Sequence, residues 1–291
     1  MKKIFIVGSL NMDLVINSPY MPKAGETITG SNFMTNGGGK GANQATACGK
    51  LGGNAVMCGV VGNDSFGETL INNLKSSGVD TTFIRKQENV STGIAVIVVA
   101  EGDNRIILDK GANAHLTEKD IDAALSRAEK GDIYLTQLEN PIDIIGYGLK
   151  KAKSLGLYTI LNPAPANVDI AEYFAYVDLI TPNETECEIF GGKDNLFKKG
   201  IKTVITTLGS KGYEIATENS SVVYPCLKVK AVDTTAAGDT LCGGLSVGLA
   251  EGKSLEESIA FGSKAASIAC TRRGAQQSVP TRAEVTEYAA D

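Results

Sequence analysis

The chain has 291 residues, of which 43% are hydrophobic and 21% charged, and its formal net charge is -5. That apolar content supports a sizeable core and excludes a disordered chain. A nucleic-acid partner would need a basic surface, so the acidic balance excludes nucleic acid and favours a small metabolite as partner.

Histidine and cysteine usage narrows the kinds of site further. His115 is the only histidine, so a site built from several histidines is impossible, and we expect a structural or solvated role for it. The six cysteines include no C-x-x-C pair, which predicts buried thiols in a reducing compartment. No apolar stretch reaches the ~18 residues that cross a bilayer, and no cleavage site follows the apolar start. We therefore expect a cytoplasmic protein without a membrane partner.

Short apolar runs alternate along the chain with stretches of helical periodicity. The expected strands are residues 3–8, 54–61, 132–135, 157–161, 177–181 and 203–207. The expected helices are residues 41–51, 66–76, 118–128, 142–154, 183–190 and 254–270. Strands that alternate with helices predict βαβ units, so we expect one α/β domain over 1–291 with helices on both faces of a mostly parallel sheet.

Two segments break this alternation. Residues 14–35 and 91–110 show the period-two pattern of strands, and neither contains a helical pattern. We interpret the two segments together as a small β-sheet that projects from the main domain and serves as a lid. Two ordinary surface hairpins are the alternative.

The glycine-rich segment 36–45 contains the pattern G-x-G-x-x-A. It does not directly follow the first strand, as a dinucleotide fingerprint would, and Lys40 is followed by glycine, which excludes a P-loop. Gly38 and Gly39 allow a ligand to approach the backbone closely, while Lys40 and Asn43 offer polar contacts at a helix start. A plain glycine-rich helix start is the alternative.

A second segment, residues 233–244, predicts a helix that begins near Gly238. Exposed amide groups and the helix dipole at such a start stabilise negative charge. Asp239 beside them would accept a proton from a hydroxyl while the amides hold a transferring phosphoryl group. The alternative is an early-helix acid that only complements the dipole.

Polar clusters follow several of the expected strands. They occupy residues 11–13, 137–139, 183–186 and 207–212. Ligands of open parallel sheets bind beyond the carboxyl ends of the strands, so these clusters converge on one crevice.

With these motifs, the sequence resembles the ribokinase family of carbohydrate kinases, also called the phosphofructokinase-B family, nearly end to end. Residues 38–43 and 233–244 resemble its two signatures, and Asn183 to Glu186 matches its N-x-x-E motif. The resemblance implies a three-layer α/β/α fold with a β-sheet lid. It also implies phosphoryl transfer from ATP to the 5-hydroxyl of D-ribose, with Mg²⁺ accompanying ATP.

The resemblance assigns residues to four groups. The catalytic base and its anion hole are Asp239, Gly238, Ala237 and Ala236. The sugar is expected at Asn11, Met12, Asp13, Gly39, Lys40, Gly41, Ala42, Asn43, Glu139 and Asp239. The nucleotide is expected at Asn183, Glu186, Thr207, Leu208, Gly209, Ser210, Lys211, Gly212, Gly238, Asp239 and Ser263. An activating K⁺ is expected between Asp233, Thr235, Ala269, Arg272, Gly274 and Ser278. The lid of the family also implies a homodimer contact.

Two departures from the family pattern stand out. Asp239 is followed by Thr240-Leu241-Cys242 instead of the usual phenylalanine and polar residue, and the short stretch 191–202 puts one outer helix in question. The alternatives are a kinase of the same family acting on 2-deoxyribose, fructose or a nucleoside, and a non-catalytic sugar-binding protein. A further alternative is a nicotinamide-dependent oxidoreductase. It would need the glycine fingerprint at the first strand, and the absence of the fingerprint there argues against this activity.

Overall fold

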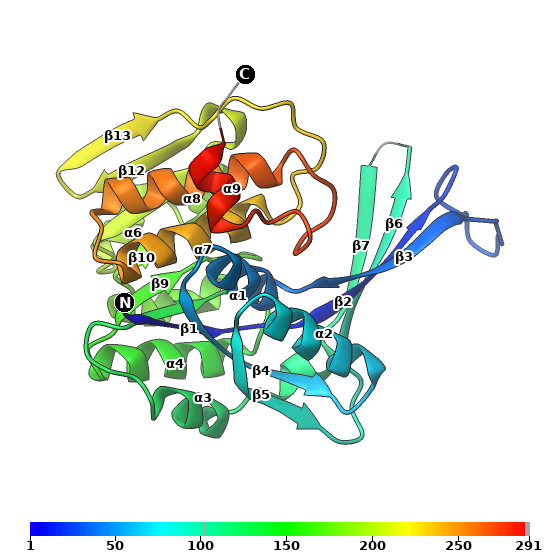
Figure 1. Ribbon diagram of the computed structural model, residues 1–291, viewed down its shortest axis with the longest axis horizontal. Helices are drawn as coiled ribbons and strands as arrows, with labels where there is room; N and C mark the ends of the chain where they lie inside the picture. Colours follow the sequence, from blue (N-terminus) through cyan, green and yellow to red (C-terminus); the bar gives the residue numbers. More distant parts are fainter. Residues whose placement is uncertain (102, 289–291) are drawn as a thin grey trace.

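Two β-sheets carry the architecture of the protein. The computed structural model describes residues 1–101 and 103–288, so Gly102, which falls in the second expected lid segment, and residues 289–291 lie outside the described residues. The large sheet lies between two layers of helices, and the small sheet projects from one side of this body (Figure 1).

The large sheet has nine strands in the order β13-β12-β11-β10-β9-β8-β1-β4-β5. These strands are β1 (Lys3–Val7), β4 (Asn54–Gly62), β5 (Asp80–Gln87), β8 (Ile133–Thr136), β9 (Tyr158–Leu161), β10 (Leu179–Ile180), β11 (Thr203–Thr207), β12 (Tyr213–Thr217) and β13 (Ser220–Tyr224). Pairing is parallel from β5 to β11, whereas β12 and β13 add an antiparallel hairpin at one edge. The expected mostly parallel sheet is confirmed.

Helices cover both faces of this sheet. The α-helices are α1 (Lys40–Lys50), α2 (Ser65–Ser76), α3 (Glu118–Leu125), α4 (Ile142–Ser154), α5 (Glu184–Ile189), α6 (Gly192–Lys198), α7 (Ala237–Ala250), α8 (Leu255–Ala269) and α9 (Arg282–Glu287). Short 3₁₀ helices are η1 (Gly111–His115), η2 (Val168–Tyr176) and η3 (Gly209–Lys211). α6 forms although the sequence put this outer helix in question, because its buried Leu196 packs onto the core.

The central strand shows how one run of residues serves two cores. Ile4 and Ile6 of β1 join the core beneath α1, α2, α7 and α8, whereas Phe5 and Val7 join the core beneath α3 and α4. Successive side chains of a strand point to opposite faces, so a strand covered on both faces must be apolar throughout. The continuous apolar pattern of β1 therefore predicted its place inside the sheet.

The sequence did not predict the strands at the two edges of this sheet. β5 reads DTTFIRKQ and is half polar, and β13 reads SSVVY and is largely exposed. An edge strand buries little of its surface, so its sequence lacks the apolar signal of an inner strand.

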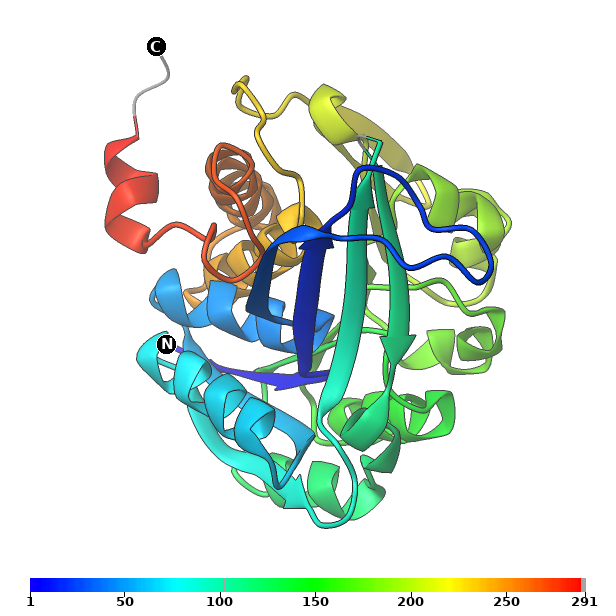
Figure 2. The same ribbon diagram turned by 90° about the vertical axis from the view of Figure 1, so that its right-hand side faces the viewer.

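The small sheet has four strands in the order β3-β2-β6-β7. These are β2 (Asn11–Asn17), β3 (Ser31–Gly38), β6 (Gly93–Ala100) and β7 (Asp103–Asp109), and Figure 2 shows them side by side across the front of the molecule. Asn11 and Asp13 therefore lie within β2 of the small sheet and not in a loop after β1. The small sheet thus brings its own polar side chains to the edge of the large one.

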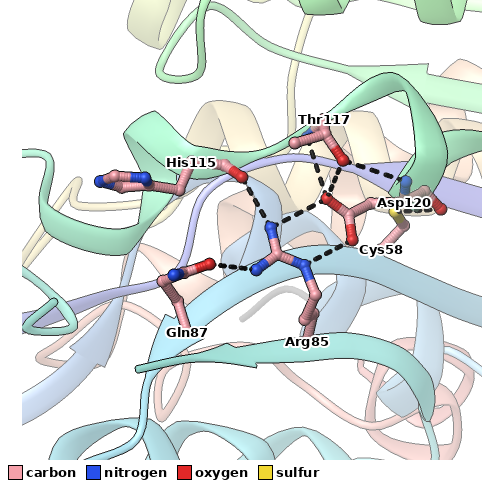
Figure 3. A network of polar contacts seen from close by, with 6 residues as sticks. All are labelled: Cys58, Arg85, Gln87, His115, Thr117 and Asp120. Carbon is pink, nitrogen blue, oxygen red and sulfur yellow. Dashed lines mark hydrogen bonds and ion pairs between the residues drawn. The ribbon is translucent and has the colours of Figure 1, made fainter. Parts of the chain in front are cut away.

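An ion pair joins the polar edge strand β5 to the start of α3 (Figure 3). Arg85 donates from Nε to Oδ1 of Asp120 at 2.7 Å and from Nη2 to Oδ2 at 3.0 Å. Burial raises the pKa of Asp120, but hydrogen bonds from Arg85 and Thr117 outweigh it and hold that pKa below its usual value. His115 contributes its backbone carbonyl, while its exposed ring points away, which confirms the expected structural or solvated role.

All six cysteines are free thiols. Cys48, Cys58, Cys187 and Cys242 are buried as expected, whereas Cys226 and Cys270 are only half-buried. The prediction of buried thiols is therefore confirmed for four cysteines and wrong for Cys226 and Cys270, which line the same cavity.

Candidate active site

The first turn of α7 leaves backbone amide groups open. Its N-cap, Ala236, has φ 58° and gives no side-chain cap, and the amide of Ala237 bonds the carbonyl of Thr234 at 3.2 Å. Among the described residues, no acceptor bonds the amides of Gly238 and Asp239. A Cβ added at Gly238 would meet nothing within 4 Å, so this helix end faces open space. The helix dipole and these two amides would together attract an anion.

Asp239 lies in this first turn and is buried, with 6% of its surface exposed. Its Oδ2 accepts a hydrogen bond from Nδ2 of Asn43 at 3.0 Å, and its Oδ1 accepts one from Nε2 of Gln44 at 3.0 Å. Both donors come from α1, which packs beside α7. The carboxylate is therefore held in one place by a neutral amide on each oxygen.

The first turn of α1 is closed by contrast. Its N-cap Gly39 has φ 86°, and the amide of Lys40 bonds Oε2 of Glu139 at 3.0 Å. The amide of Gly41 bonds the hydroxyl of Ser9 at 3.3 Å, and Ser9 in turn donates to Glu139. A Cβ at Gly39 would lie 2.8 Å from the amide nitrogen of Asn11, so only glycine allows this close packing. Glu139 therefore anchors α1 and lies beside Lys40.

Charged groups surround the space between the two helix starts. Burial opposes the charge of Lys40, but the carboxylates of Asp239, Glu139 and Glu186 outweigh it and raise the pKa of Lys40. Burial and then the charge of Glu139 raise the pKa of Asp13 to about 7. Burial also raises the pKa of Glu186. The half-buried ammonium of Lys40 carries the charge that an incoming phosphate would need.

A polar cavity of about 280 Å³ lies at the start of α7. Its lining includes Lys40, Asn162, Ala164, Thr181, Asn183, Glu186, Thr207, Thr234, Ala236, Ala237, Gly238, Asp239 and Cys242. Asn183 and Glu186 form a capping box at the start of α5, because Asn183 accepts from the amide of Glu186 at 2.8 Å and its own amide donates to Oε2 of Glu186 at 2.9 Å. The N-x-x-E motif thus has a local structural role, and its carboxylate also borders the cavity.

A larger cavity of about 560 Å³ adjoins the polar one. Both cavities share Thr207, Thr234, Ala237 and Gly238 in their lining. The larger one is also bordered by Gly209, Ser210, Gly212, Cys226, Leu227, Lys228, Val229, Ala231, Leu241, Ser263, Ala266, Ser267 and Cys270. A mostly apolar cleft that opens onto an anion-binding helix start has the form expected for a nucleotide site.

A third cavity, of about 420 Å³, lies on the side of the small sheet. It is lined by Asn11, Leu108, Asp109, Lys110, Asn113, Leu138, Glu139, Pro165, Ala166, Asn167 and Val168. Asn11 is fixed there, because its Oδ1 accepts a hydrogen bond from Nδ2 of Asn113 at 2.7 Å. A Cβ at Gly38 would lie 2.4 Å from the carboxylate oxygens of Asp13, so this glycine gives Asp13 its place.

The residues expected around K⁺ lie behind the start of α7. Asp233 Oδ2 accepts from the amide of Gly274 at 2.9 Å, and its Oδ1 accepts from the amide of Thr235 at 2.9 Å. Ala269 and Ser278 are buried, whereas the side chain of Arg272 donates to Oε1 of Glu284 at 2.6 Å. The structure therefore brings Asp233, Thr235 and Gly274 together, and the guanidinium of Arg272 is engaged elsewhere.

Three of the residues expected at the sugar, Asp13, Gly39 and Asn43, line none of the three cavities. Five further expected site residues also line none of them. Met12 is part of the apolar core, and Gly41 and Ala42 are buried in α1. Leu208 is absent from the lining of the larger cavity, and the exposed Lys211 lies 4.0 Å from Glu184. These five residues were included because they stand between motif residues, and the cavity linings do not contain them.

Other residues near Asp239 were missing from the expected set. Gln44, Gln137 and Asn162 form a buried hydrogen-bonded cluster behind Asp239. Gln137 and Asn162 directly follow β8 and β9. Gln137 was already part of the polar cluster 137–139 expected at the carboxyl end of a strand, and the same signal could have found Asn162. Gln44 stood inside the glycine-rich motif without an assigned role.

Two kinds of site are excluded for the part of the chain that the structure describes. No helix in it is long and apolar enough to span a bilayer. It also contains no group of three or more His, Cys, Asp or Glu side chains that could hold a metal ion by themselves.

This chain is similar to known proteins in both sequence and structure. The pfkB family carbohydrate kinase model matches residues 1–282. A ribokinase of Haemophilus influenzae is 42% identical over 300 residues, covering 99% of this chain and 98% of that protein. A deoxyribokinase of Salmonella typhi is 35% identical over 299 residues, covering 98% of each. The structure of an Arabidopsis thaliana ribokinase complexed with ribose and ATP has a TM-score of 0.88 at 32% identity and 98% coverage of both chains. This chain therefore belongs to the pfkB family of carbohydrate kinases.

Proposed function

We propose that this protein is a ribokinase, which transfers the γ-phosphoryl group of ATP to the 5-hydroxyl of D-ribose. The observation that carries the proposal is the position of Asp239, a buried carboxylate within a helix turn in which the amides of Gly238 and Asp239 have no acceptor among the described residues. The names of the ribokinases from Haemophilus influenzae and Arabidopsis thaliana support this choice of substrate.

The proposed reaction needs a general base and groups that stabilise the negative charge of the transferring phosphoryl group. Asp239 takes the proton of the sugar hydroxyl as the new oxygen–phosphorus bond forms, and the bond from the γ-phosphorus to the bridging oxygen of ADP breaks. The open amides of Gly238 and Asp239 and the ammonium of Lys40 stabilise the charge on the transferring group. The larger cavity holds the nucleoside part of ATP beside Ser263.

Mg²⁺ and K⁺ belong to this proposal. Mg²⁺ usually takes one or two carboxylates together with phosphates and water, and Glu186 fits because only its Oε2 is tied to the backbone of Asn183. When bound, Mg²⁺ neutralises phosphate charge. K⁺ would take oxygen ligands around Asp233, Thr235 and Gly274, where the carboxylate fixes the loop. We expect slower ADP formation when Na⁺ or a bulky organic cation replaces K⁺, and an unchanged rate would refute this part.

The small sheet would act as the lid and the dimer contact. Its two edge strands expose apolar side chains, namely Phe33, Met34, Ile106, Ile107 and Leu108. Large exposed apolar patches mark interaction surfaces. We propose that two copies pair through this sheet, and a monomeric mass in sedimentation equilibrium at micromolar concentration would contradict it. Free thiols throughout the chain favour a cytoplasmic location.

The first experiment is ADP formation with a panel of sugars: D-ribose, 2-deoxyribose, fructose and a nucleoside. Asn11 offers Nδ2 to a hydroxyl because its Oδ1 is bonded by Asn113. Loss of one buried hydrogen bond costs ~1–3 kcal/mol, so kcat/KM for ribose should exceed that for 2-deoxyribose by roughly 5- to 150-fold. A preference for 2-deoxyribose would make the protein a deoxyribokinase, and no ADP with any sugar would leave a non-catalytic binding protein.

The second experiment tests the base. Asp239→Asn keeps the shape of the side chain and removes its basicity, so kcat should fall by ~10²–10⁴-fold, the usual contribution of a general base. The Glu256→Gln variant, at an exposed position in the first turn of α8, which packs on α7, serves as the comparison for a general effect of removing an acid near α7. Near-normal turnover of Asp239→Asn would reject the mechanism.

A further inference from the structure

A chain of buried amide side chains lies behind Asp239. Gln44 Nε2 donates to Oδ1 of Asp239 at 3.0 Å and to Oδ1 of Asn162 at 3.1 Å. Its Oε1 accepts from Nε2 of Gln137 at 2.6 Å. Gln44 has no exposed surface, and Gln137 has 1%. Gln44 therefore cannot touch the sugar or the nucleotide, and every polar atom of its amide is bonded to protein.

The direction of this chain is set at both ends. Nδ2 of Asn162 donates to the backbone carbonyl of Thr181 at 3.1 Å, so Oδ1 of Asn162 must face Gln44. An ionised carboxylate only accepts hydrogen bonds, so Asp239 also requires the NH₂ group of Gln44. A flipped Gln44 amide would oppose oxygen to oxygen at both Asp239 and Asn162. Only one orientation of Gln44 satisfies all its neighbours.

We propose that Gln44 is a positioning residue for phosphoryl transfer. Its amide, which also bonds Asn162 and Gln137, holds the carboxylate of Asp239 in the orientation in which it can accept the proton of the sugar. This inference rests on the proposed role of Asp239 as the base. Asn43 bonds the other carboxylate oxygen, but it is not locked in the same way, because its buried Oδ1 has no hydrogen-bond partner among the described residues.

Other ionisable groups also face Asp239. Lys40 of α1, Glu186 of α5 and Cys242 of α7 each interact with its charge, and Glu139 acts on it through Lys40. None of them bonds Gln44. A substitution of Gln44 by a neutral residue leaves these charges in place, so a change in the pH profile between wild type and that variant reports the lost amide.

The test replaces Gln44 by methionine, which has a similar length and no donor. A hydrogen bond to a charged group is worth enough to lower kcat by about 10- to 100-fold, and KM for ATP should stay within about twofold because Gln44 lies away from the nucleotide cavity. Because the ionised carboxylate loses a donor, the acid limb of kcat against pH should move to higher pH.

Two further variants keep the test decisive. Gln44→Glu is nearly isosteric and sets a second carboxylate against Asp239, so the acid limb should again move to higher pH. Gln137→Met removes the group that locks Gln44 without touching Asp239, so it should cause a smaller change in the same direction. Should Gln44→Met fail to fold, as judged by circular dichroism and ADP binding, these two variants carry the test.

The matched control is Thr46→Val. Thr46 lies two residues further along α1, is equally buried, and its hydroxyl has no hydrogen-bond partner among the described residues. It should leave kcat and the pH profile unchanged. The proposal is overturned if the Gln44 variants fold and bind ADP but keep the wild-type acid limb, or if Thr46→Val shows the same loss. Normal turnover by Asp239→Asn would refute the proposed role of Asp239 as the base. That outcome can be told apart from a failure of the Gln44 proposal, which the Gln44 variants test.

Discussion

The starts of α1 and α7 are alike in local structure and opposite in surroundings. Both begin at an N-cap with positive φ, 86° at Gly39 and 58° at Ala236, and neither has a side-chain cap. In α1 the first amides are bonded by Glu139 and by Ser9. In α7 the amides of Gly238 and Asp239 have no acceptor in the part of the chain that the structure describes.

This difference shows what makes an anion site. A helix start supplies amides and a dipole in every case, but it is available to a ligand only where no protein group covers it. Glu139 covers the start of α1 and borders the cavity on the side of the small sheet, while open space lies beside Gly238. The glycine-rich start of α1 is thus closed by protein groups, whereas the start of α7 is available to an anion.

The largest effect should come from closing α7 as α1 is closed. Gly238→Asp adds a carboxylate at a position where a Cβ meets nothing within 4 Å. That carboxylate would compete with the phosphate of ATP for the open amides, so kcat/KM for ATP should fall by about 10²-fold or more. The side chain suits a helix start, so the melting temperature should not fall.

The matched variant is Gly238→Asn, which has the same size and no charge. Steady-state kinetics should show a much smaller loss for it than for Gly238→Asp. Equal losses in the two variants would mean that bulk and not charge closes the site, and the comparison of the two helices would then lose its electrostatic basis.

Asp13, whose carboxylate lies against Gly38 just before α1, should make the stability of the protein depend on pH. Burial and the nearby Glu139 raise the pKa of Asp13 to about 7 in the folded protein, so the folded state holds a proton there that the unfolded chain releases near pH 4. The contribution of Asp13 to stability is therefore full below about pH 4 and is lost as pH rises through 7, with a slope of up to about 1.4 kcal/mol per pH unit.

Urea unfolding of wild type and Asp13→Asn between pH 4 and 8 measures this contribution. The variant should lose less stability than wild type as pH rises across that range. Asp169→Asn, at an exposed position, is the comparison for removing an acid without burial. Parallel curves for wild type and Asp13→Asn would show that Asp13 ionises alike in both states.

The smallest effect should come from the backbone of the two N-caps. Ala236 holds φ 58°, a backbone conformation that costs an alanine roughly 1 kcal/mol relative to a glycine. The matching N-cap of α1, Gly39, is already a glycine. Ala236→Gly should raise the free energy of unfolding by at most about 1 kcal/mol, since glycine also gains freedom in the unfolded chain. A clear loss of stability would mean that the methyl group of Ala236 packs favourably.

Sequence patterns predicted the inner part of the fold and much of the site. The apolar run of β1 placed it in the centre of the sheet, and Asp239 stood out beside small residues at a helix start. The half-polar β5 and the exposed β13 gave no such signal, because an edge strand need not be apolar. Met12 was expected at the sugar only because it stands between Asn11 and Asp13, and alternation along β2 sends it into the core.

The sequence by itself determined which chemistry is present: a carboxylate at a helix start, a glycine-rich turn, and polar residues after successive strands. These signals are local, since they depend on spacing along one segment. Only the tertiary structure decided that Glu139 covers the start of α1, that α7 stays open, and that Gln44 meets Asp239 across 195 positions of the chain. Such contacts arise from the packing of distant elements, and no pattern within one segment contains them.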